Sequence, residues 1–307
     1  MAGYSEEGKE TVMAHRLIGG VLVVCCAFLA CGGERKPDGA FLDNGTVRLG
    51  VDLGAGGSIF YFAQSTTQRN LLNHRDLGRF IQQSYYGKKD GSLWAKKPWC
   101  WNPVQGGGYK GQQAKLQEKK IEKETLYIRS MPKHWATGTD VPEATMEEWI
   151  RLTGPVGHIR FRFAYSGKDE HPAKHQELPA VFVDYALPNL VFYKGDNPWK
   201  NEALTRVVPG WPNQRQHTDE CWAAYVDDKD WGIGVFFPGT KELTTYRHKG
   251  RQDPGPKGTA CSYFAPVRTM KITPGFSFEY HVYVTIGKTN EIRERFQSIQ
   301  EKTATPK

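Results

Sequence analysis

Short apolar stretches recur every ten to fifteen residues along most of this chain, and glycine, proline and asparagine stand between them. In many stretches apolar and polar residues alternate, as they do in Val47–Leu53 and His158–Tyr165. Alternation places the apolar side chains on one face of an extended chain, so each stretch predicts a half-buried β-strand. Strands of this kind must pair and cover their apolar faces, which predicts an all-β fold, a large antiparallel β-sandwich.

Several neighbouring stretches are separated by turn residues and predict hairpins. The glycine-rich turn 54–57 joins Val47–Leu53 to Ser58–Phe62, and the acidic turn 227–230 joins Trp222–Val226 to Gly232–Phe237. Residues 291–302 are different, because their apolar residues recur at helical spacing and predict a short C-terminal helix. Residues 88–111 contain three consecutive glycines and three tryptophans and predict a long loop.

The N-terminal region predicts a targeting segment rather than part of the fold. Leu17–Ala30 is an uncharged apolar run, shorter than the ~20 residues that a membrane-spanning helix needs. This length fits a signal peptide, and the sequence before Cys31 resembles a bacterial lipoprotein cleavage site, with Cys31 as the lipidated residue. Ordinary secretion after cleavage near Ala30 is the alternative.

These signals divide the chain into a signal peptide (1–30), a polar tether (31–43) and a single β-sandwich domain (44–307). The protein is therefore predicted to be exported, either as an outer-membrane or cell-surface lipoprotein held by its lipid anchor or as a periplasmic or secreted protein.

The charge and the cysteine content limit which ligands and metal sites the sequence predicts. Removal of residues 1–30 raises the net formal charge from +8 to +9, a balance that suits an acidic polysaccharide or lipid better than nucleic acid in an exported protein. Cys100, Cys221 and Cys261 have no metal-site spacing, so we expect no metal; one disulfide or three free thiols are both compatible with the sequence. No phosphate-binding or dinucleotide-binding glycine pattern is present, so no cofactor is expected.

The stretch from Asp76 to Gly107 combines the side chains that recognise sugars. Amides and guanidinium groups hydrogen-bond sugar hydroxyls, and indole or phenol rings cover the C–H faces of the sugar ring. The predicted substrate-binding residues of this stretch are Arg79, Gln83, Tyr86, Trp99, Trp101, Asn102 and Gln105. The alternative is that the aromatic residues pack in the core and the amides lie exposed on the surface.

Two further polar clusters precede apolar strands and supply candidate catalytic groups. His175 and Glu177 stand before Ala180–Val183, and Glu220 stands two residues before Trp222, a predicted sugar-binding indole. Glu177 and Glu220 together predict a two-carboxylate pair of the glycosidase type, with His175 as a further acid–base group. The alternatives are that His175 and Glu177 lie in a solvent-exposed loop and that Glu220 belongs to a charged cluster at the start of a hairpin.

Short motifs give the chain a resemblance to galactose-mutarotase-like proteins. They are the glycine-marked hairpin Gly50–Tyr61, the segment Asn70-Leu-Leu-Asn73, the pair Gly78-Arg79 and the late Pro274-Gly275. The resemblance covers residues 44–290 in organisation and implies a β-supersandwich with a sugar site on the concave face of one sheet. The mutarotase sequence around its catalytic base is absent, so mutarotase activity is not carried over.

These observations predict an exported carbohydrate-active protein, with hydrolysis of a polysaccharide or oligosaccharide by carboxylate acid–base chemistry as the leading hypothesis. A non-catalytic glycan-binding lipoprotein, a polysaccharide lyase or mutarotase-like epimerase, and a structural envelope protein are the alternatives.

Overall fold

The computed structural model describes residues 38–304, except 77, 123 and 254–257, and all of them lie in one compact unit. The predicted signal peptide and the lipidation site Cys31 lie outside the described residues and stay predictions. The three described cysteines, Cys100, Cys221 and Cys261, are free thiols. Within the described part of the chain, no helix has the length and apolar character needed to cross a membrane.

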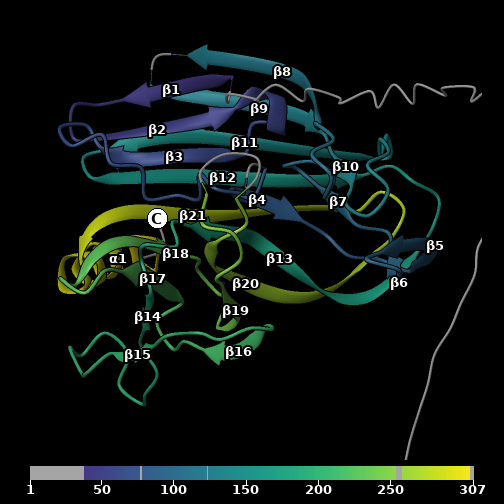
Figure 1. The fold of residues 1–307 in the computed structure, drawn as a ribbon. Helices are drawn as coiled ribbons and strands as arrows, with labels where there is room; N and C mark the ends of the chain where they lie inside the picture. The colour runs from purple at the N-terminus through teal and green to yellow at the C-terminus, as the bar shows by residue number, and fades with distance from the viewer. Residues whose placement is uncertain (1–37, 77, 123, 254–257, 305–307) are drawn as a thin grey trace, which may run out of the picture. The chain divides into compact units, whose positions relative to one another are not determined.

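Two large antiparallel sheets form the predicted sandwich (Figure 1). Alternating residues of each strand point toward the opposing sheet, as the sequence pattern predicted. The first sheet has ten strands. In spatial order they are β1 (Gly39–Asp43), β2 (Val47–Asp52), β3 (Ile59–Gln64), β4 (Ile81–Ser84), β13 (His171–Val183), β20 (Cys261–Ile272), β19 (Glu242–His248) and β16 (Gln214–His217). Off this path, β7 (Pro103–Val104) pairs with β4, and β10 (Lys133–His134) pairs with β7.

The second sheet has nine strands and carries the C-terminal helix. In spatial order they are β15 (Thr205–Val207), β14 (Asn189–Phe192), β17 (Trp222–Val226), β18 (Trp231–Phe236), β21 (Ser277–Lys288), β12 (Val156–Tyr165), β11 (Ala144–Thr153), β9 (Thr125–Met131) and β8 (Lys115–Glu122). Helix α1 (Thr289–Ala304) confirms the helix predicted at this place and contacts β17, β18 and β21 (Figure 1).

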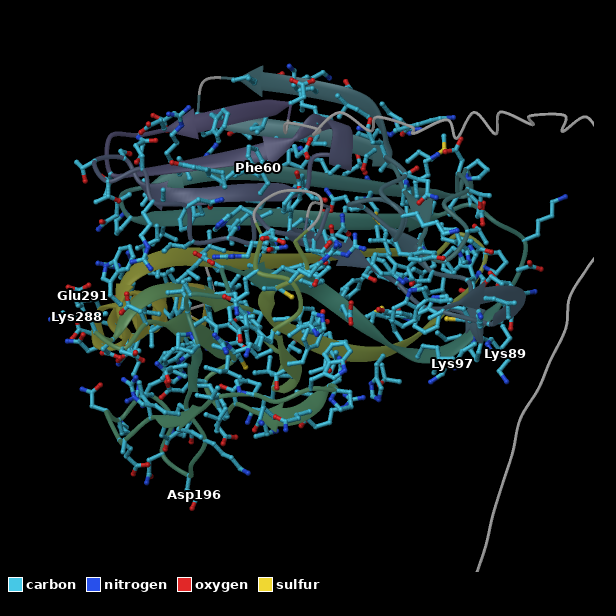
Figure 2. All side chains as sticks on the ribbon, viewed as in Figure 1. Phe60, Lys89, Lys97, Asp196, Lys288 and Glu291 are labelled. Atoms are coloured by element: carbon cyan, nitrogen blue, oxygen red, sulfur yellow. The ribbon has the colours of Figure 1, made fainter. Side chains whose placement is uncertain are left out.

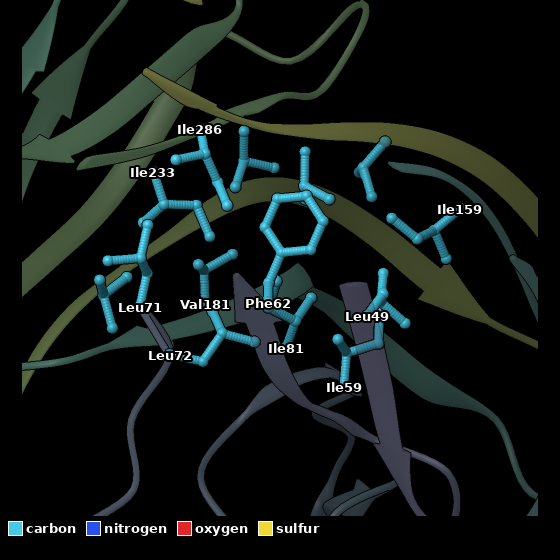
Figure 3. Close-up of a cluster of buried hydrophobic side chains, with 14 of the residues drawn as sticks. Leu49, Ile59, Phe62, Leu71, Leu72, Ile81, Ile159, Val181, Ile233 and Ile286 are labelled. Atoms are coloured by element: carbon cyan, nitrogen blue, oxygen red, sulfur yellow. The ribbon is translucent and has the colours of Figure 1, made fainter. Parts of the chain in front are cut away.

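The main core lies between the two sheets (Figure 3). Leu49, Phe62 and Val181 from the first sheet meet Ile233 and Ile286 from the second, and none of them is more than marginally exposed. Burying one such side chain contributes about 1.5–3 kcal/mol. The many side chains of this core therefore supply most of the favourable free energy that holds the two sheets together.

The predicted glycine turn lies between β2 and β3, where the short helix η1 (Leu53–Ala55) replaces a simple loop. Gly57 has φ +83°, and a Cβ atom at this position would lie 2.4 Å from Ile128 Cγ2 of the second sheet. Glycine is therefore required both by the left-handed backbone and by the close approach of the opposing sheet.

Three predicted boundaries are corrected by the structure. The predicted tether 31–43 ends in strand β1, because Gly39–Asp43 pairs with β2 and extends the first sheet. The predicted loop 88–111 contains a separate hairpin of β5 (Lys89–Trp94) and β6 (Lys97–Cys100), followed by β7. The cluster with His175 and Glu177, expected to precede the strand that begins at Ala180, is itself part of the long strand β13.

Candidate functional site

A cavity of about 380 Å³ lies on the outer face of the first sheet, over β4, β13, β20 and β19. Strand alternation explains which side chains reach it. In β4, Ile81 packs in the core while Gln82 and Ser84 line the cavity; in β20, Phe264 packs in the core while Cys261 and Tyr263 line it. The same face of β13 contributes Glu177, Ala180 and Phe182 to the cavity. The volume is in the range of small-molecule sites.

Glu177 is the carboxylate on the floor of this cavity. Its Oε1 atom accepts a hydrogen bond of 2.6 Å from the Tyr263 hydroxyl, and the side chains of Tyr86 and Ser84 hydrogen-bond it as well. Burial raises the pKa of Glu177, and these hydrogen bonds only partly oppose the rise. A carboxyl group with a raised pKa in a cavity is suited to giving or taking a proton.

Asp76 and Arg79 form a second charged group at the cavity wall. Arg79 Nε lies 3.4 Å from Asp76 Oδ2, and the guanidinium carbon lies 4.2 Å from the centroid of the Trp135 ring. Asn73 holds this turn by donating to the carbonyl oxygens of Asp76 and Arg79 at 2.8 and 2.9 Å. Burial raises the pKa of Asp76, and the charge of Arg79 works against that rise.

One wall of the cavity is built by the β5–β6 hairpin and the loops next to it. Trp94 and Trp99 contact each other at 4.8 Å between ring centroids, and Trp99 Nε1 donates to Asn102 Oδ1 at 3.2 Å. The hairpin's Lys89 and Lys97 point outward to solvent (Figure 2). Trp94 and Trp99 therefore line the cavity, whereas the two lysines reach water.

The opposite wall comes from the segment before β16 and from the end of β19. The Trp211 ring contacts the Tyr246 ring at 5.0 Å and the His248 ring at 4.8 Å between centroids. Trp211 remains 58% exposed, which makes it the most exposed indole of the cavity lining. Asn213 adds an amide to the same wall.

The structure brings some predicted site residues together. The cavity lining includes Arg79, Tyr86, Trp99, Asn102 and Glu177, which come from two separate parts of the sequence. Their convergence on one face follows from the pairing of β4 with β13.

Three predicted substrate-binding residues are corrected, because they face the protein interior. Gln83 is buried between the sheets and donates to the Glu147 carbonyl oxygen at 3.2 Å. Gln105 is buried as well and joins Gln83 N to the Gly56 carbonyl oxygen. Trp101 stacks on His171 at 4.0 Å between centroids. In each case strand or loop geometry turns the side chain away from the cavity.

Glu220 and Trp222 also lie outside the cavity, so the predicted Glu177–Glu220 pair is not formed. Glu220 is buried beneath α1, where Arg293 Nη2 and Nε lie 2.5 and 3.0 Å from its two carboxylate oxygens. Trp222 Nε1 donates to Glu220 at 2.8 Å, and its ring packs against Phe296 of the helix. This cluster holds the helix on the sheet.

His175 lies on β13 but is exposed and does not line the cavity. Its Nδ1 atom lies 2.8 Å from Thr269 Oγ1 on the neighbouring strand β20. The imidazole therefore belongs to the cross-strand surface of the sheet rather than to the site.

Several cavity residues were not predicted from the sequence. The missed residues include Asp76, Trp94, Tyr109, Trp135, Phe182, Trp211, Asn213, Tyr246, His248 and Tyr263. The alternation in β20 could have indicated Tyr263, because Tyr263 lies two residues from both Cys261 and Ala265 and therefore shares their face of the strand. Nothing local to Trp211 or Trp135 shows that their loops reach the same face.

Metal-binding side chains do not gather at this site. Within residues 38–304, as far as they are described, no three His, Cys, Asp or Glu side chains come together in a way that would hold a metal ion.

Comparison with known proteins identifies the fold. No protein-family model matches the sequence, and no curated protein matches it significantly. The structure of the Slr1438 protein from Synechocystis sp. PCC 6803 is similar with a TM-score of 0.50 and 16% identity, over 83% of this chain and 97% of that one. A galactose mutarotase-like protein from Lactobacillus casei is similar with a TM-score of 0.52 and 11% identity, over 81% and 99% of the two chains. The chain therefore has the galactose-mutarotase-like β-sandwich fold that its short motifs predicted.

Proposed function

We propose that this protein is a carbohydrate-active enzyme, a glycoside hydrolase that binds a sugar in the aromatic cavity and uses Glu177 as its proton donor. The observation that carries the proposal is the position of Glu177, a carboxyl with a raised pKa on the floor of a cavity walled by indoles. A solved structure of the same fold is described as galactose mutarotase-like, which also favours a sugar ligand.

The cavity lining matches the two kinds of surface on a sugar. Indole and phenol rings of Trp94, Trp99 and Tyr246 present apolar surface to C–H faces. The amide of Asn213 and the guanidinium of Arg79 supply groups for hydroxyls. The Asn102 amide is buried and hydrogen-bonded to Trp99 and to the Tyr85 carbonyl oxygen, so it positions the Trp99 ring instead. Aromatic and polar side chains line the cavity in similar numbers, a mixture that suits a ligand with both apolar faces and hydroxyl groups.

Hydrolysis assigns two roles to carboxyl groups. Glu177 would give its proton to the leaving oxygen as the bond to the anomeric carbon breaks, while water adds to that carbon. A second carboxylate would take the proton from the water, and Asp76 is the other carboxylate of the lining. A lyase would need a cation free to neutralise a uronate, whereas Arg79 is already paired with Asp76.

Non-catalytic glycan binding is the second candidate. It is favoured by the same Asp76–Arg79 ion pair, because that contact occupies the second carboxylate of the cavity. Under this alternative, the cavity holds a sugar and Glu177 is one more hydrogen-bonding group.

The test compares wild type with Glu177→Gln on a panel of polysaccharides and oligosaccharides, with products read by mass spectrometry and binding by calorimetry. General acid catalysis is worth about 10²–10⁴-fold, so the variant should lose at least about 100-fold in turnover. Binding should persist, because the amide keeps the shape of the carboxyl group. Glu279→Gln, at an exposed position on the second sheet, is the matched control.

The outcomes separate the two candidates. Full turnover in Glu177→Gln would remove Glu177 from catalysis. Saturable binding without product from any glycan, in wild type and variant alike, would favour the binding protein.

A further inference from the structure

The aromatic side chains of the cavity form two groups. The hairpin platform consists of Tyr86, Trp94, Trp99, Tyr109 and Trp135, linked by ring contacts at 4.8–6.4 Å between centroids. The β19 platform consists of Phe182, Trp211, Tyr246 and Tyr263, linked by ring contacts at 4.3–5.0 Å. Among the described rings, no ring-to-ring contact joins one platform to the other.

Glu177 lies where the two platforms meet. Its carboxyl group is hydrogen-bonded by Tyr263 of the β19 platform at 2.6 Å and by Tyr86 of the hairpin platform. A sugar ring stacked at the end of either platform that holds Tyr86 or Tyr263 would therefore lie beside this carboxyl group.

Trp211 shows that the β19 platform is open to a ligand. Its indole is 58% exposed, although the loop that carries it is held firmly. The Gly210 carbonyl oxygen accepts from Arg247 N at 3.1 Å, and Asn213 Nδ2 donates to Thr244 Oγ1 at 2.9 Å. A large apolar ring displayed on an anchored loop beside a cavity contributes little to the core and marks a binding surface.

We propose that two linked sugar residues straddle Glu177, one on each platform, with the linking oxygen above the carboxyl group. The ligand is then an oligosaccharide or polysaccharide rather than a free monosaccharide. This inference rests on the proposed function and adds to it where two neighbouring sugar residues of the substrate bind. Because Glu177 separates the platforms, a single stacked ring would leave one platform unused.

The test measures affinity by calorimetry for cello-, xylo-, manno-, chito- and galacturono-oligosaccharide series, each from monosaccharide to hexasaccharide. Trp94→Ala removes a ring from the hairpin platform, and Trp211→Ala removes one from the β19 platform. Trp149→Ala, on the outer face of the second sheet, is the matched control. Unfolding curves of the three variants show whether each is folded.

In wild type, affinity should rise from the monosaccharide to the disaccharide or trisaccharide of the series that binds. Each platform variant should weaken binding of the longer members about tenfold, since one stacked ring is worth up to about 1.5 kcal/mol. Affinity for the monosaccharide should fall in at most one of the two platform variants.

Two results would overturn the inference while leaving the proposed function in place. They are an affinity that does not change with chain length, and an equal loss of monosaccharide binding in both platform variants. If no series binds to wild type, the carbohydrate function fails and the inference fails with it.

Discussion

Three glutamates of this protein have the same chemistry and three different environments. Glu177 opens to a cavity and is hydrogen-bonded by tyrosines, Glu220 is sealed against Arg293, and Glu148 is buried between the sheets. Environment decides the role of each carboxyl group, because burial, a cation or a hydroxyl donor favours different protonation states. The reactive group is the one that keeps contact with a cavity.

Tyr263 tunes Glu177, and Tyr263→Phe should show it. The Tyr263 hydroxyl stabilises the ionised carboxylate, while burial keeps the pKa of Tyr263 itself well above its ordinary value. Removing the hydroxyl should raise the pKa of Glu177 further. If protonated Glu177 is the acid, the alkaline limb of the kcat/KM profile should move to higher pH. An alkaline limb that stays at the same pH or moves to lower pH would contradict this role.

At the scale of elements, short additions to the sandwich decide which face is open. The β5–β6 hairpin builds one cavity wall on the first sheet, whereas α1 covers β17 and β18 on the second (Figure 1). The helix therefore turns a surface glutamate and an indole, Glu220 and Trp222, into parts of a sealed cluster.

The Glu220–Arg293 ion pair should stabilise the docked helix. Glu220→Gln leaves Arg293 buried without its carboxylate and should lower the free energy of unfolding by about 3–5 kcal/mol in chemical denaturation. Glu291→Gln is the matched control, because Glu291 lies near Lys288 at the exposed start of the same helix (Figure 2). That control should change stability by less than about 1 kcal/mol.

Carbohydrate binding should be unchanged in both helix variants. A Glu220→Gln protein with wild-type stability and no turnover would return Glu220 to the catalytic residues.

At the scale of the whole molecule, closing the sandwich buries a carboxyl group, Glu148, at a cost in free energy. Both carboxylate oxygens of Glu148 are buried without a hydrogen bond of normal geometry to any described residue. Burial raises the pKa of Glu148 well above its ordinary value, and the nearby Gln105 amide opposes this only in part. The folded protein therefore holds a proton at Glu148 that the unfolded chain releases near pH 4.5.

Stability should consequently fall as pH rises above that value. In this range the unfolded chain binds fewer protons than the folded one, and each pH unit costs up to about 1.4 kcal/mol until the folded group ionises. Glu148→Gln should flatten this dependence, so the difference in unfolding free energy between variant and wild type should grow from pH 5 to pH 8. If the unfolding free energies of wild type and variant change with pH in parallel, Glu148 is not the source of the pH dependence.

The sequence alone determined the class of fold and part of the site. Alternation and turn residues predicted the hairpins β2–β3 and β17–β18, because both signals are local to each strand. The same local pattern predicted Arg79, Tyr86, Trp99, Asn102 and Glu177. They lie in or near the paired strands β4 and β13 of the first sheet and in the separate β5–β6 hairpin and the residues after it.

Tertiary structure alone decided which face of each strand stays open. Period-two alternation tells that Gln82 and Gln83 point to opposite faces, but not which face meets the second sheet. It likewise cannot show that residues 289–304 cover Glu220 or that Trp211 reaches the cavity opposite Trp94. These outcomes depend on contacts between segments far apart in the chain, and they separate a buried ion pair from a reactive carboxyl group.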